Sequence, residues 1–314
     1  MTPSKERLVQ VTPGIWYADV LYRDTARLIA CAATETSRGL VLIDPGPGCT
    51  LGNLEEALAP WGGFERVCAV FLTHIHLDHA GASGLIVHRW PHVKVYVHTA
   101  GVSHMINPER LLRSVRRLYG DRMDVLWGPV LPVPVRNVCE VSHGMEIAIG
   151  QQSWTVLYTP GHASHHVAYH DFNSNTLFVG DAAGMRVRGA DQVIPVAPPP
   201  DIDLEQWEHS LDLIEAGEPR RLFLTHFGPV EDVRLHLATM RNRLHVWSNA
   251  VRLSLMDKRS DDERMRIFQA REMARTRRNL PPEYRQPYEI MGQPAGSWQG
   301  LARYWRTKKG LGNQ

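Results

Sequence analysis

Four side chains that can bind a metal ion lie within six residues of one another. Residues 73–80 read THIHLDHA and contain His74, His76, Asp78 and His79. Imidazole nitrogens suit zinc, iron and nickel, and a carboxylate adds a harder oxygen ligand. Because His74 and His76 are two positions apart, an extended backbone places both on one side. A lone histidine is usually structural, but this density of ligand types predicts a metal site.

Three further candidate ligands each follow an apolar run and stand next to glycine or one residue from it. His162 ends the segment TPGH, Asp181 ends VGD, and His226 lies in LTHFG. Side chains at strand ends converge on a common edge of a sheet sandwich, where a rigid scaffold holds them. We therefore expect these three residues to meet the first four in space.

The remaining pattern predicts the elements that position these residues. The apolar run VCAVFL at 67–72 is typical of a buried strand leading into the first cluster. Other strands are predicted at 14–20, 28–33, 39–43, 93–98, 138–141, 146–149, 154–158, 167–170 and 176–179. Helices are predicted at 52–61, 108–119, 204–216, 231–256 and 261–278, with Asp203 as a candidate N-cap.

The strand at 39–43 runs into an acidic, glycine-rich turn, Asp44-Pro45-Gly46. Asp44 either orients a neighbouring metal ligand or braces the turn. A phosphate-binding loop is disfavoured, because no lysine followed by serine or threonine stands at the required spacing.

The domain organisation is predicted from changes in element pattern and charge along the chain. Residues 1–230 carry the strands and all the candidate ligands. Within them, residues 101–136 interrupt the alternation of strands and helices, and form either a lid or pocket wall or a packed surface insertion. Residues 231–314 are predicted to be a helical C-terminal region, with 17 Lys/Arg against 9 Asp/Glu. That positive balance either forms a solvated helix face or steers an anionic substrate.

Composition limits the classes of protein that fit. The chain has 314 residues, 43% hydrophobic and 22% charged, as in ordinary globular proteins. Its net charge of +2 gives no overall attraction to polyanions, so nucleic acid is not an expected partner. The four cysteines form no CxxC pair, which argues against a zinc ribbon or a disulfide framework. Without a signal-peptide pattern or an apolar span, we expect a cytoplasmic protein with no membrane association.

Counting ligands predicts a centre with two metal ions. Three neutral imidazoles can hold one metal and leave a position open, namely His74, His76 and His162. The second metal can take Asp78, His79 and His226. Asp181 can bridge both metals through its two oxygens. A water shared by two metals would be acidified to a pKa of about 7 and supply hydroxide at neutral pH.

In this order the motifs resemble those of the metallo-β-lactamase fold superfamily. The resemblance rests on HxHxDH at 74–79, GH at His162, GD at Asp181, TH at His226 and the IDPG turn at Asp44. It covers residues 10–230 and implies an αββα sandwich with the metals at one edge. Residues 159–166, TPGHASHH, are similar to the glyoxalase II pattern TPGHTxGH. In that reading His166 is a hydrogen-bonding support and His165 replaces a glycine.

The resemblance implies a dinuclear metal-dependent hydrolase that uses a bridging hydroxide on a thioester or other activated ester, as hydroxyacylglutathione hydrolases do. Asp78 and Asp181 would orient the water. The cofactors would be two divalent ions, zinc by default, with iron or manganese also suited to these ligands. We expect a small-molecule substrate, with an anionic one as an option. The oligomeric state is left open, a dimer being one option.

Several alternatives share part of this pattern. Antibiotic-degrading members typically lack the bridging aspartate and oxygen-reducing diiron members carry an acid at the position of His76, so both activities are disfavoured. A lactonase or phosphodiesterase could use the same site, although the tyrosine that lactonases place after the aspartate is missing. A persulfide dioxygenase would use one iron on His74, His162 and Asp181. A non-catalytic scaffold is disfavoured because no ligand is lost.

Overall fold

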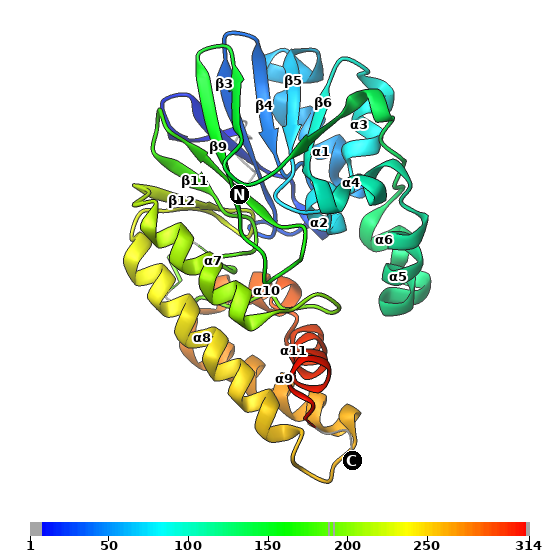
Figure 1. Ribbon diagram of the computed structural model, residues 1–314, viewed down its shortest axis with the longest axis vertical. Coiled ribbons are helices and arrows are strands. Elements are labelled where there is room, and N and C mark those ends of the chain that lie inside the picture. Colours follow the sequence, from blue (N-terminus) through cyan, green and yellow to red (C-terminus); the bar gives the residue numbers. More distant parts are fainter. Residues whose placement is uncertain (1–7, 188, 191, 312–314) are drawn as a thin grey trace.

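Two β-sheets lie face to face with helices packed outside them, as Figure 1 shows. The computed structural model describes residues 8–187, 189–190 and 192–311. The first sheet has seven strands in sequential order: β1 (Leu8–Thr12), β2 (Ile15–Asp19), β3 (Ala30–Thr36), β4 (Gly39–Ile43), β5 (Val67–Phe71), β6 (Lys94–His98) and β7 (Val138–Val141). The second has six, in the order β13 (Gly228–Val230), β12 (Arg221–Leu224), β11 (Thr176–Phe178), β10 (Val167–Asp171), β9 (Gln152–Tyr158) and β8 (Glu146–Ile149).

Strand direction explains the sequence pattern of the first sheet. Neighbours pair antiparallel from β1 to β4 and parallel from β4 to β7. The parallel strands β4 and β5 have helices on one face and the second sheet on the other, so they read as continuous apolar runs. In the second sheet only β11 and β12 are parallel among the described pairs.

An aromatic core joins the two sheets. Phe71 of β5 lies with ring centroids 5.1 Å from Trp154 and 4.8 Å from Tyr169, which belong to the opposite sheet. All three side chains are buried. Each buried aromatic of this size contributes roughly 1.5–3 kcal/mol through removal of apolar surface from water. This core fixes the end of β5, where the first ligand cluster begins.

Helices cover the outer faces and form the C-terminal region. Their bounds are α1 (Leu51–Leu58), α2 (Leu77–Ala80), α3 (Ser83–Arg89), α4 (Thr99–Ile106), α5 (Glu109–Tyr119), α6 (Met123–Trp127), α7 (Leu204–Ala216), α8 (Val233–Ser254), α9 (Asp261–Asn279), α10 (Pro282–Met291) and α11 (Pro294–Lys309). Short 3-10 segments are Tyr22–Asp24, Gly48–Thr50, Ala59–Trp61, Gly63–Arg66, Gly120–Arg122 and Val135–Asn137. The predicted αββα sandwich with a helical C-terminal region is confirmed.

The C-terminal helices pack on one another and on the sandwich. Helix α11 contacts both α8 and α9, and α8 runs beside α7 (Figure 1). Arg241 of α8 donates to Glu208 and Asp212 of α7, each at 2.7 Å. Trp247 and Leu301 are buried in the same apolar cluster as the helix-covered face of the first sheet. No helix in the described ranges is both long enough and apolar enough to cross a bilayer.

Candidate metal centre

All seven predicted ligands lie together at one edge of the two sheets. The first four follow β5, in the loop after Phe71 and in α2. Of the others, His162 follows β9, Asp181 follows β11 and His226 lies between β12 and β13. Their ligand atoms form sets within which all atoms are at most 4.8 Å apart. The first group is His74, His76 and His162, and the second group is Asp78, His79 and His226; a further set, His74, His79 and Asp181, overlaps both.

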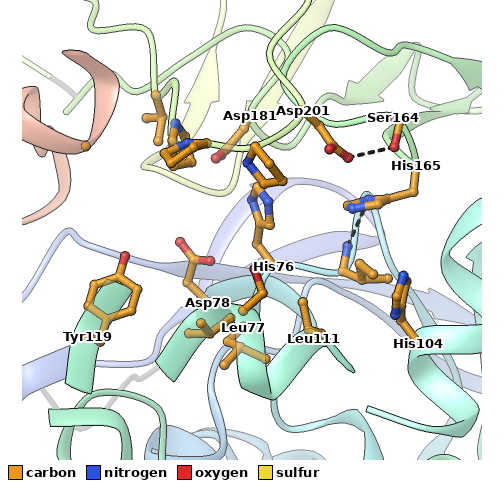
Figure 2. Close-up of a pocket in the computed structure, with 18 of the residues that line it drawn as sticks. His76, Leu77, Asp78, His104, Leu111, Tyr119, Ser164, His165, Asp181 and Asp201 are labelled. Carbon is orange, nitrogen blue, oxygen red and sulfur yellow. Dashed lines mark hydrogen bonds between the residues drawn. The ribbon is translucent and has the colours of Figure 1, made fainter. Parts of the chain in front are cut away.

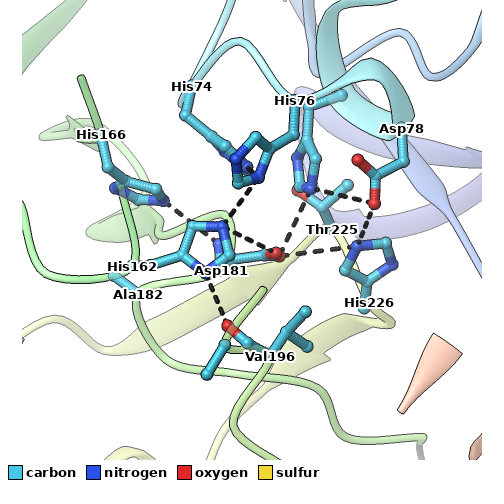
Figure 3. A network of polar contacts seen from close by, with 12 residues as sticks. His74, His76, Asp78, His162, His166, Asp181, Ala182, Val196, Thr225 and His226 are labelled. Carbon is cyan, nitrogen blue, oxygen red and sulfur yellow. Dashed lines mark hydrogen bonds and ion pairs between the residues drawn. The ribbon is translucent and has the colours of Figure 1, made fainter. Parts of the chain in front are cut away.

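Three imidazole nitrogens converge in the first group. His76 Nδ1 lies 2.9 Å from His74 Nε2 and 3.0 Å from His162 Nε2 (Figure 3). His162 Nδ1 is 2.6 Å from the carbonyl oxygen of Val196, which fixes its proton there and leaves a lone pair on Nε2. Burial lowers the pKa of His74 and lowers that of His76 to about 4. These neutral rings present several lone pairs to one point, which is the donor set a metal ion requires.

The second group leaves buried polar atoms without hydrogen bonds. His79 Nε2 and His226 Nε2 of this group and the neighbouring Asp181 Oδ1 are buried and have no hydrogen-bond partner among the residues that the structure describes. They lie within ion-pair distance, at 3.4 Å for His79 and 3.5 Å for His226 from Asp181 Oδ1, but not in hydrogen-bond geometry. Leaving such atoms unpaired typically costs about 1–3 kcal/mol each. A cation between them would satisfy all three, so the residues present fit a metal site.

Asp181 stands between the two groups. Its Oδ1 faces His79 and His226, while Oδ2 lies 3.4 Å from His162 Nε2. Burial opposes ionisation of Asp181, but the surrounding histidines outweigh it and hold its pKa well below the usual range. The two carboxylate oxygens of Asp181 therefore face different sets of histidine nitrogens, and the carboxylate is ionised.

Carboxylates near His79 and His226 raise the pKa values of these two histidines in the second group. Burial alone would lower the pKa of His79, but Asp181, Asp44 and Asp78 raise it well above its usual value. The pKa of His226 is also raised, because Asp181 and Asp78 outweigh the effect of burial. Burial opposes ionisation of Asp78, yet His79 and His226 lower its pKa to about 2. The raised pKa values of the two histidines and the lowered pKa of Asp78 show that the group favours positive charge.

Asp44 resolves the alternatives left open by the sequence. Its buried carboxylate accepts from the backbone N–H of Thr73 at 2.8 Å. Its Oδ2 accepts from the hydroxyls of Thr73 and Thr225 and from His79 Nδ1, each at 2.7 Å. The bond to His79 places the proton on Nδ1 and leaves Nε2 free for a metal. Asp44 therefore orients a candidate ligand.

The sequence pattern could have predicted two contacts that support the site, namely the hydrogen bonds from Thr73 and Thr225 to Asp44. Thr73-His74 and Thr225-His226 are both Thr-His pairs, and both hydroxyls bond the same Asp44 oxygen. The carbonyl oxygen of Leu28, 2.6 Å from His226 Nδ1, had no such signal because a backbone acceptor leaves no mark in the sequence.

His166 has the supporting position that the resemblance implied. Its Nε2 accepts from the backbone N–H of Asp181 at 3.2 Å, and its Nδ1 donates to the Thr159 hydroxyl at 2.8 Å. Figure 3 shows His166 beside Asp181 at the margin of the network. His166 fixes the segment that carries Asp181 and leaves no free ring nitrogen for a metal.

A cavity of about 350 Å³ opens onto this cluster and is lined by His76, Asp78 and Asp181 (Figure 2). One wall comes from residues 100–127 and includes Leu111, Tyr119 and Trp127. Another comes from the C-terminal helices and includes Met291 and Gln293. Residues from the segment 101–136 thus line one side of this cavity.

Tyr119 connects these two walls. Its hydroxyl donates to Gln293 Oε1 at 3.4 Å, joining the end of α5 to the residue before α11. Burial, with a contribution from Asp78, raises the pKa of Tyr119 to about 12, so the phenol stays protonated near neutral pH. The cavity is therefore bounded by segments far apart in the sequence, and its apolar side chains lie next to the metal-binding cluster.

An αββα sandwich with histidines and aspartates gathered at one sheet edge defines a metal-binding enzyme scaffold. The family model of the metallo-beta-lactamase superfamily matches residues 27–226, which is more than half of the chain. The chain belongs to this superfamily, and it is a metallo-hydrolase of that class.

Relatives and solved structures agree with that assignment. The chain is 28% identical over 216 residues to ST1585, a metallo-beta-lactamase fold-containing protein of Sulfurisphaera tokodaii, covering 67% of this chain and 77% of that protein. It is 26% identical over 113 residues to a hydroxyacylglutathione hydrolase of Legionella pneumophila, covering 36% of this chain and 32% of that enzyme. The chain thus matches about a third of that enzyme's length. The structure of TTHA1429 from Thermus thermophilus shares the fold, with a TM-score of 0.69, 21% identity, and 96% and 95% of the two chains covered.

Proposed function

We propose that this protein is a dinuclear metal-dependent hydrolase of thioesters or other activated esters, similar to hydroxyacylglutathione hydrolases. The observation that carries the proposal is the position of Asp181, whose two oxygens face different groups of histidine nitrogens. A carboxylate in that position suits two cations better than one. The identity to an enzyme named for thioester hydrolysis supports the choice of substrate class.

Each proposed ligand has a defined place in this scheme. One ion would be held by His74, His76 and His162, and the other by Asp78, His79 and His226, with Asp181 shared. When bound, such a pair acidifies a water to a pKa of about 7 and stabilises negative charge on the substrate oxygen. Zinc is the proposed ion, while iron and manganese suit the same donors.

The protein's own groups position the reactants. Asp78 stays ionised and lines the cavity, so it can accept a hydrogen bond from the attacking water. Asp181, also ionised, can hold that water from the other side. The apolar wall at Leu111 and Trp127 can cover the acyl group and exclude bulk water.

The arrangement favours this activity over the one-iron alternative. A persulfide dioxygenase centre would need only His74, His162 and Asp181. It would leave Asp78, His79 and His226 close enough together to hold a second ion but with no metal assigned to them. A phosphodiesterase or lactonase would use the same two ions and would differ from the proposed hydrolase only in its substrate.

We further propose that the substrate is a small anionic molecule. Arg110 of α5 lines the cavity, is exposed, and makes no hydrogen bond or ion pair within the described ranges. Its guanidinium can bind a carboxylate or phosphate at the mouth of the cavity. A cytoplasmic location is also proposed, since Cys31, Cys49, Cys68 and Cys139 are all free thiols.

A substrate panel tests the main proposal. The zinc-loaded protein is assayed on a thioester, an aryl ester, a lactone and bis-nitrophenyl phosphate. We expect the thioester or ester to have the highest kcat/KM, and His76→Ala to abolish that activity. Preferential cleavage of the phosphodiester, or a protein that binds one iron and consumes oxygen, would overturn it.

Two thioesters with the same acyl group, one with a charged thiol part and one with a neutral part, test the anionic substrate. Arg110→Ala should lower kcat/KM for the charged thioester about tenfold, the effect of roughly 1.4 kcal/mol, and leave the neutral one unchanged. Arg116→Ala, on another face of α5, is the matched control and should change neither. Equal loss on both thioesters would contradict an anion contact at Arg110.

A further inference from the structure

His165 lies in the cavity but belongs to none of the candidate metal-binding groups. It follows His162 by three residues in the loop between β9 and β10, and its side chain is only 8% exposed. It lines the cavity together with His76 and Asp78. The support of Asp181 from this loop comes from His166, so His165 is not needed for that contact.

The hydrogen bond that His165 makes fixes where its proton is. Its Nδ1 accepts from the backbone N–H of Ile75 at 3.4 Å. A dashed line from His165 marks this hydrogen bond in Figure 2. An accepting Nδ1 is unprotonated, so the neutral ring carries its proton on Nε2. That Nε2–H has no hydrogen-bond partner within residues 8–187, 189–190 and 192–311. His165 therefore offers the cavity a donor whose orientation is set by the backbone.

The position of this donor relates it to the first group of ligands. The His165 ring centroid is 5.8 Å from that of His76 and 6.1 Å from that of His74, with which it is stacked. Figure 2 shows His165 near His104 on one side of the cavity and Tyr119 on the other. Because both residues line the cavity, a substrate bound next to His76 can contact His165.

We infer that His165 is a catalytic residue, whose Nε2–H donates a hydrogen bond to the carbonyl oxygen of the bond that is hydrolysed. The inference rests on the proposed function. When water adds to the carbonyl carbon, the π electron pair moves onto that oxygen, where the donated hydrogen bond stabilises the charge. The pair returns as the thiolate or alkoxide leaves, and the proton lost by the water ends on the leaving group. The net reaction gives an acid and a thiol or alcohol.

The donor would act on the transition state more than on the bound substrate. The oxygen gains charge only as water adds, so the hydrogen bond strengthens at that point. Loss of one such donor typically lowers kcat by about 10²–10³-fold. The effect should appear in kcat with KM little changed, whereas a residue that only packs the loop would alter metal content or stability first.

Two substitutions distinguish the roles of the two ring nitrogens of His165. His165→Asn keeps an oxygen near the Nδ1 position for the Ile75 N–H but has no atom at Nε2. His165→Gln places an N–H group near Nε2. We expect H165N to lower kcat about 100-fold with two metals still bound, and H165Q to recover most of that loss. H165N within about threefold of wild type, or H165Q as inactive as H165N, would overturn the inference. His92→Asn, at an exposed histidine, is the control and should leave kcat unchanged.

A second measurement does not depend on activity. Nitrogen-15 NMR of the metal-free wild-type protein should show His165 as the Nε2–H tautomer, and an Nδ1–H tautomer would contradict the inference even if a variant fails to fold. A failure of the proposed function can be told apart from a failure of this inference. If the proposed function is wrong, the wild-type protein hydrolyses no ester or thioester, and NMR still determines the tautomer of His165.

Discussion

Asp44 is buried and charged, and it accepts hydrogen bonds from two threonines and one histidine. Among the residues that the structure describes, its oxygens accept from a backbone N–H, two hydroxyls and the His79 ring, and from no lysine or arginine. At the residue scale, the orientation of a candidate ligand, His79, therefore depends on a carboxylate outside the candidate metal-binding groups. Such outer contacts fix the tautomer and direction of the ligating ring.

Asp44→Asn tests this role. The amide presents N–H groups to donors, so at least one of the bonds from Thr73, Thr225 and His79 is lost. We expect the free energy of unfolding to fall by about 3 kcal/mol, and metal affinity to fall about 10–100-fold. Urea denaturation and a chelator competition measure the two quantities. Thr225→Val removes one donor and keeps the charge, so its effect should be smaller; equal effects would contradict a special role for the charge.

The pH dependence of metal binding follows from the raised pKa values of His79 and His226. Below those values each ring holds a proton where a metal would bind, so acid weakens the second site. Burial lowers the pKa of His74, His76 and His162, so protons compete less at the first site. From about pH 8 to about pH 5.5 we expect the second metal to lose affinity by up to about tenfold per proton per pH unit. Chelator titrations at each pH measure both sites; parallel slopes would contradict the prediction.

At the scale of elements, Gly161 shows how a loop presents a ligand. Its φ is +128°, and a Cβ there would lie 2.3 Å from the Trp207 Cα of α7. The loop before His162 therefore lies directly against the helix backbone, and the Gly161 carbonyl also accepts from Asp203 N–H at 2.9 Å. Only glycine fits such a conformation with so close a contact.

Gly161→Ala should lower the free energy of unfolding by about 3 kcal/mol through backbone strain and overlap, and should displace His162. Thermal unfolding and zinc content are the measurements. Gly120→Ala is the matched control, since its φ is +55° but nothing lies within 4 Å of an added Cβ. Its cost should be about 1 kcal/mol with zinc content unchanged. The same loss in both variants would contradict a role for close packing at Gly161.

Elements with strong local patterns were predictable from sequence. The expected strands at 39–43, 138–141 and 146–149 and the helix at 204–216 match β4, β7, β8 and α7, and Asp203 caps α7 by accepting from Gln206 N–H at 3.1 Å. The strand expected at 28–33 is β3, which runs from Ala30 to Thr36; Leu28 and Ile29 are buried but lie before it. Buried positions need not lie in a strand.

Other elements were not predictable. Helix α4, TAGVSHMI, contains glycine and β-branched residues that disfavour an isolated helix, and its packing on β6 and β7 holds it in place. Helix α10 begins at Pro282 and includes Pro287, which a sequence pattern treats as a break. The cavity depends on Tyr119 meeting Gln293, a contact across 174 residues that no local pattern records.

At the scale of the whole molecule, the C-terminal helices complete the cavity beside the metal centre. Met291 and Gln293 line the cavity, while Trp247 and Leu301 share the apolar cluster of the sandwich. The seven candidate ligands were found from sequence because each follows a strand end, and strand ends meet at one edge. The supporting acceptors and the second cavity wall arise only when distant segments pack together.

The most direct test of this account is the number of metal ions bound per chain. Metal-free protein is titrated with zinc, and bound metal is quantified by elemental analysis after removal of excess. The account predicts two zinc ions per wild-type chain and one for His226→Ala, which spares the histidine group of the first site. One ion per wild-type chain, or an unchanged count in His226→Ala, would contradict the paired centre.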